Sequence, residues 1–149
     1  MFVGIVVEGA VQGAVLAAVG LGLSRFTRDV VGRALLAFVL VVAAMLYIVF
    51  AAVAGESVGW LAAEAAGVAL YGTAAVLGVR GSYWWLVAGW ALHPVWDIAL
   101  HYVGPGAAFA PTFYTVACLG FDLVVAAAIA LAYRFGLDGR NTPVAELVR

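Results

Sequence analysis

Five apolar stretches, each about as long as a membrane span, follow one another along the chain. A helix needs about 20 residues to cross the roughly 30 Å hydrocarbon core of a bilayer. The connections between the stretches are short and contain Gly, Pro, Ser and charged residues, which favour turns. The pattern therefore predicts five membrane-spanning helices, and we place them at residues 2–23, 30–54, 58–79, 83–103 and 111–135.

Composition agrees with a membrane protein. The 149 residues are 67% hydrophobic and 10% charged, whereas soluble domains are about 45–50% apolar and about 25% charged. We expect an all-α, polytopic membrane protein in which residues 1–135 form one bundle of five transmembrane helices and residues 136–149 form a polar cytoplasmic tail. The chain has no Lys and a net charge of −1, so it lacks the basic patch that nucleic acid requires. Its single cysteine, Cys118, cannot form an internal disulfide.

The arginines predict an orientation, because cytoplasmic loops collect basic residues. They fall between or beside the first two spans, between the third and fourth spans, and after the fifth span. We therefore expect a multi-pass protein of the cell membrane, with the N-terminus outside and the C-terminus in the cytoplasm. The basic residues are Arg25, Arg28, Arg33, Arg80, Arg134, Arg140 and Arg149.

The fourth span carries three ionisable residues at four-residue spacing: His93, Asp97 and His101. On an α-helix, residues spaced by four project from one broad face. An ionisable group inside a membrane indicates a functional site, because exposing it to lipid is costly. His93 and His101 would be about 12 Å apart along the helix axis, too far for both to bind one ion comfortably.

Other spans place polar residues at a similar depth, between the membrane midplane and the outer surface. With the predicted orientation, Glu8 and Gln12 of the first span, Glu64 of the third, and Cys118 and Asp122 of the fifth all fall in this layer. Four carboxylates without an embedded Arg or Lys must be protonated, shared with a histidine, or neutralised by a bound cation.

A divalent metal ion of unknown identity is one economical solution, because imidazole and carboxylate suit Zn, Fe, Mn, Cu or Ni. The candidate ligands are His93, Asp97, His101, Glu64 and Asp122. Of these, His93, Asp97, Glu64 and Asp122 are also the candidate catalytic acids and bases. The alternative is that these side chains only join helices through hydrogen bonds.

Two further features predict local structure. Pro94 lacks an amide hydrogen and should kink the fourth span, leaving the carbonyl of Trp90 without its helical partner. Gly9 and Gly13 form a small-residue stripe that permits close helix contact, either inside the bundle or in a homo-oligomer.

The second half of the chain resembles an uncharacterised family of small prokaryotic integral-membrane proteins. The resemblance rests on the His-x-x-Trp-Asp pattern of residues 93–97, followed by Pro111, Cys118 and Asp122, with Glu64 in the preceding span. It implies a helical membrane fold and a shared polar site, but no reaction. Tyr102 follows His101 where a second histidine often occurs, which puts a three-histidine or dinuclear site in doubt.

The polar layer favours a small membrane enzyme of hydrolase, isomerase or cyclase type, acting on a lipid or isoprenoid-like apolar substrate through a metal ion or acid–base chemistry. Two alternatives stay open: a component of a cation or proton transporter, and a structural subunit of a membrane complex. The sequence leans against transport, because the inner halves of the spans lack an ionisable relay.

Overall fold

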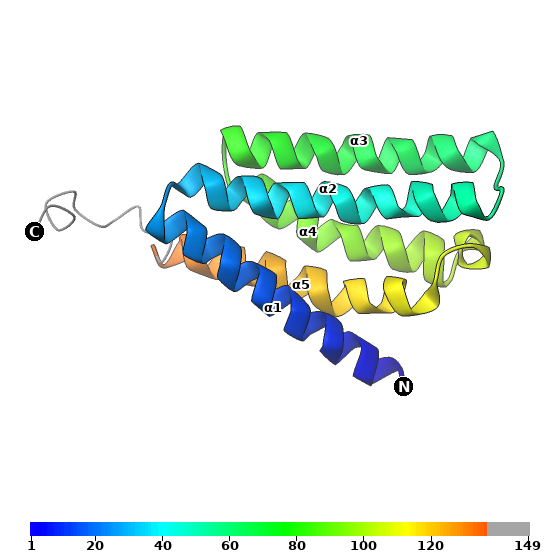
Figure 1. The fold of residues 1–149 in the computed structure, drawn as a ribbon, viewed down its shortest axis with the longest axis horizontal. Coiled ribbons are helices and arrows are strands. Elements are labelled where there is room, and N and C mark those ends of the chain that lie inside the picture. Colours follow the sequence, from blue (N-terminus) through cyan, green and yellow to red (C-terminus); the bar gives the residue numbers. More distant parts are fainter. Residues whose placement is uncertain (137–149) are drawn as a thin grey trace, which may run out of the picture.

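The structure is a computed structural model that describes residues 1–136, and within that range it is all-helical. The predicted tail lies outside the described residues apart from its first residue. In chain order the helices are α1 (Phe2–Phe26), α2 (Asp29–Val53), α3 (Val58–Arg80), α4 (Trp84–Trp96), the π-helix η1 (Asp97–Tyr102), the 3-10 helix η2 (Pro105–Ala108) and α5 (Thr112–Arg134) (Figure 1).

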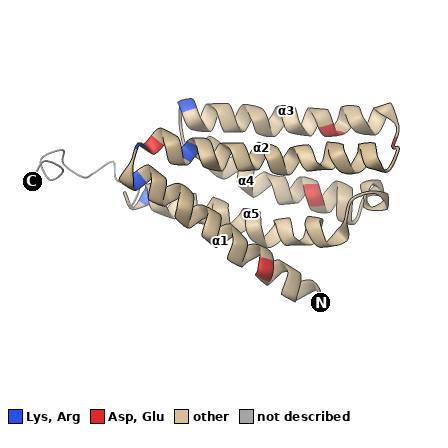
Figure 2. Ribbon diagram, viewed as in Figure 1, with Lys and Arg blue, Asp and Glu red and all other residues tan. Residues whose placement is uncertain are grey.

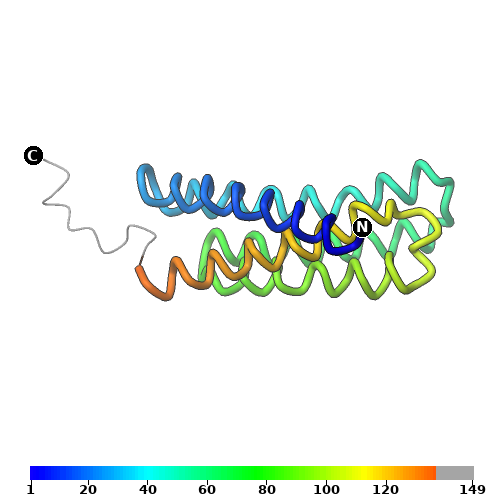
Figure 3. Tube along the Cα trace, turned by 90° about the horizontal axis from the view of Figure 1, so that it is seen from below, coloured from blue at the N-terminus to red at the C-terminus, as the bar shows by residue number. Residues whose placement is uncertain are grey.

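The long helices form an elongated bundle in which each packs against the next along the chain (Figures 1 and 3). The helix α5 returns to pack against α1, so the five helices close into a ring. Met1 and the end of α5 lie at opposite ends of the bundle, as an odd number of spans requires.

Four helices, α1, α2, α3 and α5, have 23–25 residues each and are long and apolar enough to cross a membrane. Many large apolar side chains face outward rather than into the bundle, among them Val3, Phe38, Val49 and Phe113. Such a surface suits lipid and would be a liability in water. The protein is therefore a polytopic helical membrane protein.

The fourth predicted span differs from the other four because it is not a continuous α-helix. The helix α4 has 13 residues, and η1 continues it directly for another six. In η1 the backbone bonds reach one residue further, and Val103 N–H donates to the carbonyl of Ile98 at 3.0 Å. Pro94 lies one turn before this change and cannot donate a backbone hydrogen bond, which gives the distortion a local cause.

The apolar core fills the half of the bundle near the α1–α2 and α3–α4 turns. Trp90 is its largest side chain and is fully buried. Around it pack Leu36, Leu40, Leu86, Val125 and Ile129, each at most 1% exposed.

At the end of this core a buried arginine ties three parts of the chain together. Arg33 of α2 pairs with Asp29 at 2.6 Å and donates to Tyr133 of α5 at 3.2 Å and to the carbonyls of Gly78 and Gly81 at 3.2 and 2.8 Å. Tyr133 also donates to Asp29. Figure 2 shows the basic residues of the described chain gathered at this end. The orientation in which this end faces the cytoplasm stays a prediction.

Candidate metal centre

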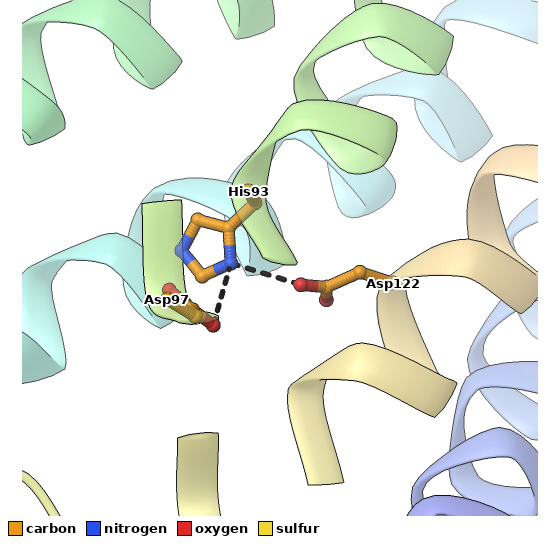
Figure 4. A group of neighbouring side chains, drawn as sticks. All are labelled: His93, Asp97 and Asp122. Carbon is orange, nitrogen blue, oxygen red and sulfur yellow. Dashed lines mark hydrogen bonds and ion pairs between the residues drawn. The ribbon is translucent and has the colours of Figure 1, made fainter. Parts of the chain in front are cut away.

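Three ionisable side chains from α4, η1 and α5 meet inside the bundle: His93, Asp97 and Asp122 (Figure 4). The Nδ1 atom of His93 lies 2.9 Å from Oδ2 of Asp122 and 3.4 Å from Oδ2 of Asp97. One ligand atom from each residue lies within 4.8 Å of the other two. We call these three residues the His/Asp/Asp cluster.

The His/Asp/Asp cluster is inaccessible to solvent, since each of its residues is 0% exposed. It combines two carboxylates with one imidazole, so protonating the imidazole neutralises only one of two carboxylate charges. His93 Nε2 and Asp122 Oδ1 receive no hydrogen bond from the described residues, and the oxygens of Asp97 receive no well-aligned one, although the side chains of Tyr47 and Cys118 lie close to them. Buried polar atoms are normally paired, so each of these requires an explanation such as an ion or ordered water.

A second buried pair adjoins the cluster, since its member Glu64 lines the same small enclosed pocket as His93. The Nε2 atom of His101 is 2.9 Å from Oε1 of Glu64, and both residues are at most 1% exposed. The ring of Tyr47 stacks on His101 with 3.8 Å between centroids. Asp97 and His101 both lie in the π-helix, whose turns are wider than those of an α-helix. His101 therefore does not project from the same helix face as His93 and Asp97 in the way that four-residue spacing on an α-helix predicts. The structure therefore brings Glu64 to His101 and Asp122 to His93.

An apolar cavity of about 340 Å³ lies between α1, α2 and α5 and reaches the cluster at Asp122. Glu8 and Gln12 of α1 also line it, and both side chains are exposed. Cys118 is buried and contributes to the same wall.

A model of the family DUF6010, described as a family of unknown function, matches residues 8–134 of the chain. The chain belongs to DUF6010. The matched range covers α1 from Glu8 onward, all the later helices and both buried ionisable groups, and the assignment agrees with a resemblance to an uncharacterised family. No curated protein and no solved structure matches this DUF6010 chain.

Three residues around the buried groups of this DUF6010 protein were absent from the sequence-based site. Tyr71 lies edge-on to His93 with 4.8 Å between ring centroids, and its hydroxyl donates to the carbonyl of Leu92 at 3.3 Å. Thr115 accepts a hydrogen bond from Tyr47 at 3.4 Å.

Helical spacing could have revealed two of these residues. Tyr71 follows Glu64 by seven positions, and Thr115 precedes Asp122 by seven, so each shares a helix face with a named acid. A Tyr or Thr at such a position is common in ordinary helix packing. Only the neighbouring helices decide whether it reaches a site.

The small-residue stripe packs within the chain. A Cβ atom at Gly9 or Gly13 would collide with the carbonyl oxygen of Ala117 or Phe121 of α5, respectively. The homo-oligomer through Gly9 and Gly13 stays a prediction.

Proposed function

We propose that the protein is a metal-dependent membrane enzyme in which His93, Asp97 and Asp122 hold one divalent cation. The observation that carries this proposal is the convergence of one imidazole and two carboxylates, all fully buried, with one ligand atom from each within 4.8 Å of the other two. A divalent cation bound to Oδ2 of Asp97 and Oδ2 of Asp122 would neutralise the charges of the two carboxylates.

The spacing of the ligand atoms suits a small cation. Zinc binds His nitrogen and carboxylate oxygen at about 2.0–2.2 Å, which in a tetrahedral site separates the ligand atoms by roughly 3.3–3.6 Å. The separations from His93 Nδ1 are 2.9 Å to Asp122 and 3.4 Å to Asp97. Small adjustments of the side chains would complete such a site, and the same donors also suit Fe, Mn, Cu or Ni.

The arrangement favours a catalytic over a structural ion. Three protein ligands leave a fourth position for water or substrate, which is typical of catalytic zinc sites. Asp122 also lines the apolar cavity, so a substrate there would lie beside the ion. A bound ion would polarise a substrate oxygen or activate a water, which suits a hydrolase, isomerase or cyclase acting on a lipid or isoprenoid-like molecule.

The structure of the inner half argues against the alternative of ion transport. The His/Asp/Asp cluster and the Glu64–His101 pair lie on the side of Trp90 away from the arginine-rich end. The described part of the inner half is instead filled by large apolar side chains such as Leu40 and Ile129. An ion path to the cytoplasm would need polar groups or water there.

Metal analysis of the purified protein tests the proposal. The full chain, extracted in mild detergent and reconstituted with Zn, Mn or Fe, should retain about one equivalent of one of these metals after desalting. Asp97→Asn and Asp122→Asn keep side-chain volume but remove a charged ligand, so each should lower occupancy at least about tenfold while helical content is unchanged.

Glu64→Gln is the matched control, because it makes the same carboxylate-to-amide change in a buried residue outside the cluster. Its metal content should equal that of the wild type. A wild-type protein that retains none of the metals offered, or Asp97→Asn and Asp122→Asn variants with full occupancy, would overturn the proposal.

A further inference from the structure

We infer that the cavity between α1, α2 and α5 binds a single-chain amphiphile whose head group donates hydrogen bonds and carries no negative charge. That this ligand is the substrate rests on the proposed function. The cavity volume of about 340 Å³ falls within the roughly 300–1,000 Å³ of small-molecule pockets. Most of its wall is apolar, formed by residues such as Val39, Leu46, Phe113 and Phe121, which suits a hydrocarbon chain.

The charge of the cavity selects the head group. Its lining contains two carboxylates, Glu8 and Asp122, and no Lys or Arg. Without a cation at the cluster both carboxylates would repel a phosphate or carboxylate, and with a cation bound to Asp122 the carboxylate of Glu8 still would; a hydroxyl or ammonium group could donate hydrogen bonds to Glu8 in either state. The shared chemistry of the ligand is therefore a donor head group on an apolar chain.

Glu8 and Gln12 support this assignment because neither has a partner among the described residues, although both lie on a membrane-spanning helix. An unpaired carboxylate facing lipid is costly, and polar residues within spans mark substrate or ion pathways. They lie one turn apart on the cavity side of α1. A bound head group would satisfy both.

The packing of α1 explains how a lipid could enter. Close to its C-terminal end, α1 touches α2 so tightly that a Cβ at Gly20 would lie 2.7 Å from Leu36, and Gly32 packs against the backbone of Gly20. Toward its N-terminus α1 instead follows α5 and diverges from α2 (Figure 1). The cavity occupies this gap between the first half of α1 and the second half of α2, open to the membrane.

Asp122 connects the cavity to the His/Asp/Asp cluster. One of its oxygens faces His93, while Oδ1 is buried without a hydrogen bond from the described residues. A ligand in the cavity therefore has a buried acceptor at the deep end and Glu8 at the other wall.

Photolabelling with matched lipids tests the inference. Three C16 probes would carry the same diazirine in the chain and end in an alcohol, an amine or a carboxylate. In detergent-purified full-length protein, the alcohol and amine should label α1 and α5 at least about fivefold more than the acid, and excess hexadecanol should compete. Glu8→Gln should reduce labelling by the amine more than labelling by the alcohol, because it removes only the charge.

Two substitutions on α2 provide a matched pair. Ala43→Phe adds an aromatic ring to the cavity wall and should abolish selective labelling. Ala34→Phe makes the same change on the same helix, but in a shallow groove shared with α3, and should leave labelling unchanged. Equal labelling by all three probes, or equal loss in both variants, would overturn the inference.

Metal content measured on the same samples separates this inference from the proposed function. Selective labelling by a protein that binds no metal would support the cavity and reject the metal enzyme. Full metal occupancy without selective labelling would reject the amphiphile site and leave the metal centre standing.

Discussion

At the scale of single residues, the two buried histidines differ in what surrounds them. His93 faces two carboxylates, whereas His101 has one carboxylate partner, Glu64, and a stacked tyrosine; each ring keeps one nitrogen without a hydrogen bond from the described residues. An excess of carboxylates favours a bound cation. A one-to-one pair needs none, so we regard the Glu64–His101 pair as a structural contact between α3 and η1.

This difference predicts the outcome of a double-mutant comparison. His101→Phe keeps a ring against Tyr47 but leaves Glu64 buried without its partner, so it should destabilise the protein by about 3–5 kcal/mol. Adding Glu64→Leu removes the orphaned carboxylate and should restore most of that stability. Reversible unfolding in mixed micelles measures both variants. A single variant as stable as the wild type would show that the pair contributes little.

At the scale of elements, α1 differs from the other helices because it buries only small residues. Its buried positions are Gly9, Gly13, Ala17, Gly20 and Ser24. They permit close backbone contact with α5, where Gly120 packs in turn against the carbonyl of Val6. The position of α1, and with it one wall of the cavity, therefore depends on contact between backbones.

Two glycine-to-alanine substitutions on α1 test this dependence. Gly9→Ala would drive a methyl group into the backbone of α5 and should destabilise the protein by about 1–3 kcal/mol. Gly4→Ala has no atom within 4 Å of the added Cβ and should be neutral or stabilising by up to about 1 kcal/mol. Thermal unfolding in detergent compares them. Equal melting temperatures would contradict the close packing of α1 on α5.

At the scale of the whole molecule, the bundle separates two polar regions by an apolar core. The Arg33 group joins α2, α5 and the α3–α4 turn at one end, and the buried ionisable groups lie toward the other. Together with the arginine distribution, this polarity predicts that the His/Asp/Asp cluster lies in the outer half of the membrane.

Accessibility of engineered cysteines tests the orientation. In a Cys118→Ala background, Val3→Cys and Phe135→Cys place thiols at positions that are 72% and 68% exposed. A membrane-impermeant maleimide should label Val3→Cys from outside intact cells and Phe135→Cys only in inside-out vesicles. Labelling of both from the same side would contradict the five-span topology.

The sequence alone determined the fold class and most helix positions. In a bilayer every backbone N–H and C=O group must be hydrogen-bonded within the protein, and long apolar helices meet this requirement. The helices α1, α2, α3 and α5 begin and end within a few residues of the predicted spans. The sequence also identified His93, Asp97 and Asp122 as candidate residues, because ionisable side chains are conspicuous within apolar stretches.

Only the tertiary structure decided which candidates meet. The spacing of His93, Asp97 and His101 predicts that they share one helix face, but the π-helix that begins at Asp97 interrupts this arrangement. The pattern of apolar residues does not predict where an α-helix changes to a π-helix. Glu64 consequently pairs with His101 and not with the His/Asp/Asp cluster. Contacts between helices depend on rotation and packing, which periodicity within one helix does not specify.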